Sequence, residues 1–133
     1  LSLFRLNGLL VAEGDRMAEA LGLTSARWKV IGVVALAHSG VTVPGIARAL
    51  GQSRQAVQRI TDVMEKDGLL SYEDNPEHKR SVLVCLTEAG QDVYTALRAV
   101  QDPWAIDSTD DVPGDELETG LQLVRRLIYK FDR

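Results

Sequence analysis

Two expected helices joined by a glycine turn constrain the fold of this chain most strongly. Residues 42–50 predict a short helix that Thr42 can cap, and Gly51 supplies the turn after it. Ser53 then opens a second helix that runs to Lys66. A short helix, a tight turn and a longer helix in this order predict a helix-turn-helix.

The second of these helices has two chemically different faces. Val57, Ile60 and Met64 recur at the spacing of one helical face and predict its buried side. A polar helix face is most often only solvated, so the surrounding sequence has to decide its meaning. Arginine can pair bidentately with guanine and glutamine with adenine, which makes a face of these residues suited to the major groove of DNA. The exposed face has no acidic residue before position 62 and consists of Arg54, Gln55, Gln58 and Arg59.

A two-stranded sheet is expected directly after this helix. Gly68 is suited to end the helix in a left-handed conformation. Residues 69–73 and 82–86 have the composition of strands, and the polar residues between them predict a hairpin. Residues 41–43 could add a third short strand. The sequence therefore predicts a small β-hairpin, or wing, at about residues 71–86.

The loop of this expected hairpin is polar and ends in two cations. It contains the turn-forming pair Asn75-Pro76 and finishes with Lys79 and Arg80. One interpretation is a solubilising hairpin tip. The other is a DNA contact, because a long arginine on a wing can enter a narrow minor groove, where negative potential is concentrated.

Charge is distributed unevenly along the chain. The formal net charge is −4 at pH 7, which taken alone argues against a nucleic-acid partner. Residues 102–118, however, hold seven acidic residues and no lysine or arginine. Phosphate binding depends on the local field and not on the total charge, so the asymmetry favours DNA binding by the helix-turn-helix region. Residues 20–61 contain no acidic residue and five cations, namely Arg27, Lys29, Arg48, Arg54 and Arg59.

The two ends of the chain carry more apolar surface than one neighbouring helix would cover. Residues 3–21 and 115–131 both predict helices with broad apolar stripes. Residues 25–38, in contrast, predict a helix that is apolar all round at its centre and therefore buried, and residues 88–104 predict a helix after the wing. The surplus apolar faces favour a two-fold homodimer built from the chain ends.

These elements predict one mainly α domain over residues 1–133 with a small β-hairpin wing. We expect dimerisation helices at residues 1–22 and 103–133 and a DNA-binding region at residues 24–100. No apolar run reaches the roughly 20 residues of a membrane span, and the apolar residues 1–11 predict a helix and not a signal peptide. The single cysteine, Cys85, fits a reducing cytoplasm.

The sequence carries no recognisable catalytic or metal-binding motif. It has no glycine-rich phosphate loop, no nucleophile elbow and no HExxH, so we expect neither an enzyme nor a cofactor. His38, His78 and Cys85 fall short of a zinc signature. Cys85 is interpreted as a half-buried, unreactive thiol, because a redox sensor would need a cationic setting.

Several short motifs occur in register along residues 21–90. They are Leu21-Gly22-Leu23-Thr24, then Arg27-Trp28, the helix-turn-helix, Gly68-Leu69-Leu70, the segment from Asn75 to Ser81, and Leu86-Thr87-Glu88-Ala89-Gly90. In this order they resemble a MarR-type (multiple antibiotic resistance regulator) winged helix-turn-helix transcription factor.

The resemblance implies a homodimer whose two subunits each read one half of a pseudo-palindromic operator in double-stranded DNA, most often as a repressor. It also implies a small aromatic or phenolic effector near Trp28, whose alternative role is that of a core tryptophan. The implied DNA-binding residues are Ser53, Arg54, Gln55, Gln58, Arg59, Lys79 and Arg80, with Thr42 and Arg48 as further phosphate contacts.

One departure from the family pattern falls in the wing. The family commonly has Asp-Pro-x-Asp-Arg-Arg there, whereas this chain has Asn75 and His78 at the acidic positions. The carboxylate that would brace Arg80 is therefore expected to be missing. This departure keeps open a winged helix that serves as a protein-interaction module, and a dimerisation fragment of an enzyme is a further alternative.

Overall fold

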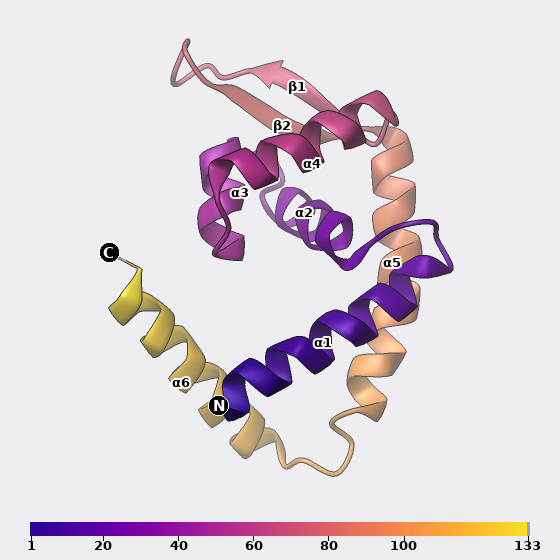
Figure 1. Ribbon diagram of the computed structural model, residues 1–133, viewed down its shortest axis with the longest axis vertical. Coiled ribbons are helices and arrows are strands. Elements are labelled where there is room, and N and C mark those ends of the chain that lie inside the picture. Colours follow the sequence, from indigo (N-terminus) through magenta and orange to yellow (C-terminus); the bar gives the residue numbers. More distant parts are fainter. Residues whose placement is uncertain (133) are drawn as a thin grey trace. The chain divides into compact units, whose positions relative to one another are not determined.

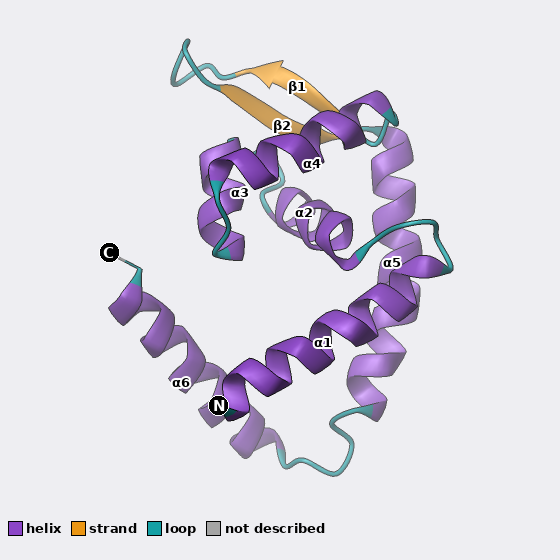
Figure 2. Cartoon of the chain, viewed as in Figure 1, coloured by secondary structure: helices purple, strands orange, loops and turns teal. Residues whose placement is uncertain are grey.

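The computed structural model describes residues 1–132, which form six helices and one two-stranded antiparallel sheet (Figures 1 and 2). The chain divides into two compact units, residues 1–100 and the residues from 101 onward. The mainly α class with a small hairpin is confirmed. The elements are α1 (Ser2–Glu19), α2 (Ser25–Leu36), α3 (Val43–Leu50), α4 (Arg54–Lys66), β1 (Leu70–Asp74), β2 (Val82–Leu86), α5 (Glu88–Asp107) and α6 (Gly114–Phe131).

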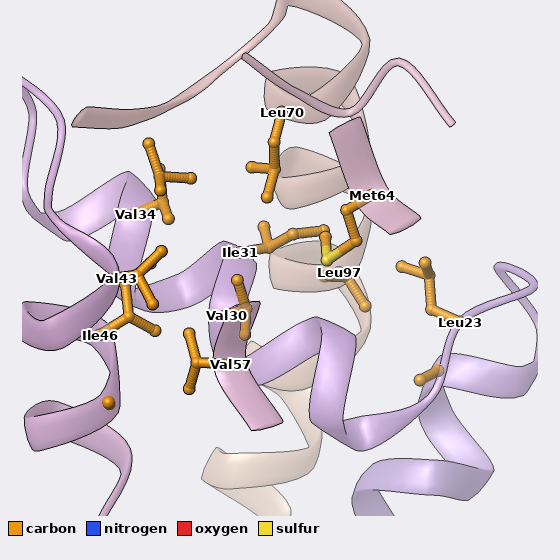
Figure 3. Packing of buried hydrophobic residues seen from close by; sticks show 13 residues of the cluster. Leu23, Val30, Ile31, Val34, Val43, Ile46, Val57, Met64, Leu70 and Leu97 are labelled. Carbon is orange, nitrogen blue, oxygen red and sulfur yellow. The ribbon is translucent and has the colours of Figure 1, made fainter. Parts of the chain in front are cut away.

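Helix α2 lies at the centre of the first unit and contacts α1, α3, α4 and β2. Val30 and Ile31 are fully buried, and Ile31 lies near Met64 of α4 and Leu97 of α5 in Figure 3. The prediction of a central helix is confirmed, but its extent was overestimated. The helix ends at Leu36, whose side chain is 70% exposed, so α2 is not buried on every side.

Side-chain caps define the helix-turn-helix as the sequence predicts. The Thr42 hydroxyl accepts a hydrogen bond from the Gly45 amide at 3.2 Å, and the Ser53 hydroxyl accepts one from the Ala56 amide at 3.1 Å. Gly51 ends α3 with φ of +62°, a left-handed conformation that favours glycine. These three positions set where α4 begins.

The wing is a two-stranded hairpin, and its expected third strand is only a single bridge. Strand β1 pairs with β2 in a register that joins Leu70 to Leu86. Val41 pairs with Val84 as an isolated bridge, while Val43 is already the first residue of α3. The third strand was therefore a wrong prediction, because α3 begins before the chain can extend along β2.

Helix α1 is joined to the first turn of α2 by one carboxylate. Asp15 accepts a hydrogen bond from the Ser25 amide at 2.7 Å. Gly14, next to it, leaves room for Ser25 and Trp28, since a Cβ there would lie 3.2 Å from the Ser25 Cβ. The Ser25 amide, followed by smaller contributions that include Lys29, holds the pKa of Asp15 below its usual value of 3.8.

The Asp15 carboxylate should stabilise the folded protein less in acid than near neutral pH. A group whose folded pKa is lowered stabilises the fold above its unfolded pKa, and that contribution disappears as the pH falls through the folded value. Asp15→Asn keeps an acceptor for Ser25 but has no charge to lose. We therefore expect wild type to melt at a higher temperature than this variant near pH 6, with the difference shrinking below about pH 4. A difference that stays constant down to pH 3 would contradict this assignment.

The second unit contains the last part of α5 and helix α6. None of the described residues of α6 is buried. No helix among the described residues is long and apolar enough to span a membrane. The apolar side chains that α6 exposes are Leu117, Leu121, Leu123, Val124, Ile128 and Phe131.

Candidate nucleic-acid interface

The first turns of α4 present three long polar side chains to solvent. Arg54, Gln55 and Arg59 are exposed, and none of them makes a side-chain hydrogen bond or ion pair with another residue in the range 1–132. The opposite side of the helix is buried through Val57 and Met64. Three unpartnered donors in the first two turns of a helix form a surface suited to DNA, and the backbone amides and helix dipole at its N-terminus also attract anions.

Gln58, the fourth residue of the predicted reading face, is already engaged within the protein. Its amide nitrogen donates to Asp62 Oδ1 at 2.8 Å and to the Tyr72 hydroxyl at 3.0 Å. The Tyr72 hydroxyl lies 2.6 Å from Asp62 Oδ1 and 2.9 Å from the Thr61 hydroxyl. The sequence pattern does not point to Tyr72, whereas the spacing of Gln58 and Asp62 by four residues on a helix is a signal that could have identified Asp62.

The same hydrogen bonds perturb the two titratable groups of this cluster. The hydrogen bond from Tyr72, followed by that from Gln58, lowers the pKa of Asp62 from its usual 3.8. Burial, followed by the Asp62 carboxylate, raises the pKa of Tyr72 above 10.0. Near neutral pH the carboxylate is thus charged and the phenol is protonated, as the hydrogen bond between them requires.

Asn75 braces the backbone of the wing loop but does not contact Arg80. Its side chain is buried, accepts a hydrogen bond from the Glu77 amide at 3.0 Å and donates to the Ser81 hydroxyl at 3.0 Å. Ser81 in turn donates to the carbonyl oxygen of His78 at 3.2 Å. The loop backbone is therefore held by a neutral residue. Arg80 is exposed and makes no side-chain bond to any described residue.

Removing this brace should weaken DNA binding more than it weakens the fold. In Asn75→Ala the loop loses both side-chain hydrogen bonds, so Arg80 has to be ordered when DNA binds. We expect about three- to tenfold weaker operator binding, corresponding to roughly one net hydrogen bond. Anisotropy titrations would measure the change. Asn75→Asp is the matched control, because its carboxylate still accepts from the Glu77 amide and can accept from the Ser81 hydroxyl, to which Asn75 now donates. Equal losses in both variants would contradict this role.

The remaining candidate residues have mixed surroundings. The side chains of Thr42 and Ser53 are already used as helix caps. Arg48 is exposed, as a phosphate contact requires. Arg27, one of the cations of the acid-free segment, forms an ion pair with Asp67 at 3.1 Å and is therefore partly neutralised. Lys79 is exposed on the wing loop beside Arg80.

Trp28 is half-buried, and its ring lies close to Gly14 of α1. An open cavity of about 380 Å³ lies elsewhere in the first unit, at the C-terminal end of α2, and Trp28 does not line it. That cavity is lined by His38, Glu73 and Cys85 among others. The predicted effector site at Trp28 is therefore distinct from this cavity.

Cys85 lies beside the carboxylate of Glu73. Burial, followed by Glu73, raises the pKa of its thiol above 9.0. A protonated thiol is a poor nucleophile, in keeping with the interpretation of an unreactive cysteine. Among residues 1–132 no group of three or more histidine, cysteine, aspartate or glutamate side chains could hold a metal ion.

Comparison with known proteins identifies relatives over most of the chain. The model of the MarR family matches residues 21–81. An uncharacterized protein of Mycobacterium tuberculosis is 39% identical over 119 residues, which cover 81% of this chain and 82% of that relative. The transcriptional activatory protein BadR of Rhodopseudomonas palustris is 33% identical over 97 residues, or 71% of this chain and 55% of BadR.

Solved structures share the fold. CouR from Rhodococcus jostii, bound to p-coumaroyl-CoA, superposes with a TM-score of 0.88 at 19% identity, covering 96% of this chain and 89% of CouR. A mutant MarR from E. coli complexed with operator DNA superposes with a TM-score of 0.75 at 24% identity, covering 96% of this chain and 94% of that one. At these identities the likeness establishes the fold.

Proposed function

This chain belongs to the MarR family of DNA-binding transcriptional regulators, and we propose that it acts as a homodimeric repressor that reads a pseudo-palindromic operator. The observation that carries the proposal is the N-terminal half of α4, where Arg54, Gln55 and Arg59 are exposed and unpartnered among the described residues. They lie in a segment without acidic residues, so neighbouring phosphates meet no repulsive charge from it.

Exposed apolar surface on both terminal helices supports the homodimer. In α1 the side chain of Phe4 is 81% exposed, and Leu3 and Leu9 are also exposed. In α6 the side chain of Phe131 is 74% exposed. Apolar surface of this extent is usual at subunit interfaces, and a two-fold pair would place two α4 helices to meet successive major grooves.

The wing would supply a second contact next to the major groove. Lys79 and Arg80 stand on a loop that Asn75 braces, on the same hairpin as the Tyr72 that contacts α4. An arginine in this position would reach the narrow minor groove beside the half-site, as it would in the family pattern. The proposed dimer would therefore use four contact regions, two helices and two wings.

An aromatic effector is proposed to weaken operator binding. CouR was crystallised with p-coumaroyl-CoA, an aromatic acyl thioester, and Trp28 lies near the α1–α2 junction of this chain. A ligand that binds better to a dimer with a different spacing of α4 helices would lower DNA affinity by that difference in affinity. BadR is described as a transcriptional activatory protein, whereas we propose that this chain represses transcription. A reporter gene placed behind the protein's own upstream DNA distinguishes activation from repression.

The proposed function is tested by measuring both the preference of the protein for its upstream DNA and the number of subunits bound per operator. A labelled duplex from the protein's own upstream region is titrated with protein, and unlabelled upstream or random duplexes are added as competitors. We expect at least about 10³-fold stronger competition by the upstream duplex and two subunits per operator in sedimentation. Binding without preference, or one subunit per operator, would overturn the proposed function. Binding of neither duplex would favour a protein-interaction module that meets an acidic partner.

A further inference from the structure

The Gln58 amide has no hydrogen left to offer to DNA. Its nitrogen lies 2.8 Å from Asp62 Oδ1 and 3.0 Å from the Tyr72 hydroxyl, and an amide nitrogen carries two hydrogens. The orientation of the amide follows from chemistry, because an ionised carboxylate can only accept hydrogen bonds. The group that faces Asp62 must therefore be the nitrogen, and the amide oxygen remains as the acceptor without a partner.

The cluster is anchored on two elements, so this orientation exists before DNA arrives. Tyr72 is half-buried on β1 and pairs with Val84 of β2. Its hydroxyl proton goes to Asp62, so its lone pair is available to the Gln58 amide. Thr61, fully buried in α4, lies 2.9 Å from the same hydroxyl and donates to the main-chain carbonyl oxygen of Gln58. Strand β1 thus fixes a side chain on α4.

We propose that Gln58 reads DNA through its amide oxygen alone and that Asp62 and Tyr72 are the positioning residues that impose this. This inference rests on the proposed function. A bidentate contact to adenine needs one donor and one acceptor from glutamine, and here the donors are occupied. A lone acceptor selects a base with an exocyclic amine in the major groove, which is the N6 amine of adenine or the N4 amine of cytosine.

The experiment starts by finding the base pair that Gln58 reads. Duplexes bound by wild type and by Gln58→Ala are selected from a randomised pool, and the position whose preference disappears in the variant is assigned to Gln58. On one strand of that position wild type should accept adenine and cytosine about equally, and should prefer both about tenfold over guanine and thymine. Gln55→Ala is the control from the same helix, and it should leave this position unchanged.

Base analogues then distinguish a single hydrogen bond to the exocyclic amine from a bidentate contact. Removing the exocyclic amine at this position should weaken wild-type binding about tenfold, whereas replacing adenine by 7-deazaadenine should change it less than about twofold. Equal sensitivity to both analogues would show a bidentate contact and overturn the inference. Clear discrimination between adenine and cytosine on that strand, as a second contact would produce, or an unchanged preference in Gln58→Ala, would overturn it as well.

Asp62→Asn tests the positioning role itself. Asparagine can donate as well as accept, so the Gln58 amide is no longer forced into one orientation. We expect the tenfold preference at this position to fall to about twofold, while preferences at other positions and the salt dependence stay as in wild type. An unchanged preference would remove Asp62 from the account. A wild-type protein that binds no duplex would overturn the proposed function and this inference together, whereas the outcomes above overturn the inference alone.

Discussion

Gly90→Ala should destabilise the protein by about 3 kcal/mol or more, because the backbone of another segment occupies the space of the new methyl group. A Cβ at Gly90 would lie 2.0 Å from the carbonyl oxygen of Leu69 and 3.2 Å from the Leu86 side chain. The nearer neighbour is held in place, since the Leu69 oxygen accepts from the Thr87 amide at 3.1 Å. Helix α5 would have to move away from the start of β1.

Thermal melting at fixed protein concentration measures this effect. We expect the melting temperature of Gly90→Ala to fall by roughly 10 °C or more, or the variant to fail to fold. Gly32→Ala is the matched control, because Gly32 lies within α2 and a Cβ there would meet no atom within 4 Å. That control should be neutral or stabilising by up to about 1 kcal/mol. Similar losses in both variants would contradict the close approach as the cause.

Replacing Arg54 and Arg59 together by alanine should reduce operator affinity by about 100-fold. Each guanidinium can contact phosphate or guanine, and one such contact contributes about 1–3 kcal/mol. Neither side chain has a partner among residues 1–132, so their loss should leave the fold unchanged. Anisotropy titrations on the upstream duplex measure the affinity, and thermal melting verifies that the fold is intact.

Arg16→Ala is the control for the loss of positive charge. Arg16 is an exposed arginine of α1 that forms an ion pair with Glu13, so its removal tests charge without touching α4. We expect less than about a twofold change in DNA affinity. If Arg16→Ala weakened binding as much as the changes in α4, DNA binding would follow from overall charge and not from the reading face.

Local sequence signals predicted the parts of the fold that depend on neighbouring residues. Thr42 and Ser53 cap helices within their own segments, and Gly51 and Gly68 take the left-handed conformations that their helix ends need. Such features are encoded over three or four residues, so the pattern alone is enough to find them. The motif Leu86-Thr87-Glu88-Ala89-Gly90 is also visible in the sequence, but only the structure shows that glycine is needed at position 90 because of the close contact with Leu69.

Contacts between distant segments could not be predicted in this way. Tyr72 joins Asp62 and Gln58 across the turn between α4 and β1, and only the register of the hairpin brings its hydroxyl there. The sequence pattern therefore assigned Gln58 to free base contact and missed its internal partners. The pattern predicts that Arg80 lacks its bracing carboxylate, and its side chain has no partner among the described residues. The pattern does not show that the Asn75 amide would hold the loop backbone.

The extent of burial was also misjudged where tertiary contacts decide it. The apolar run in α2 predicted a helix buried on all sides, yet its last residue, Leu36, is largely exposed. Hydrophobic periodicity gives the face that turns inward but not where a helix emerges from the core.

The measurement that tests the central claim most directly is the salt dependence of wild-type binding to a duplex from its own upstream region. A protein that contacts DNA phosphates through arginines of α4 and the wing releases counterions when it binds. We therefore predict a linear fall of log K with log salt, with a slope of about −0.9 for each phosphate contact. Arg80→Ala should make this slope shallower by about one unit. Affinity that is independent of salt, or no binding even at low salt, would contradict the account of this chain as a DNA-binding regulator.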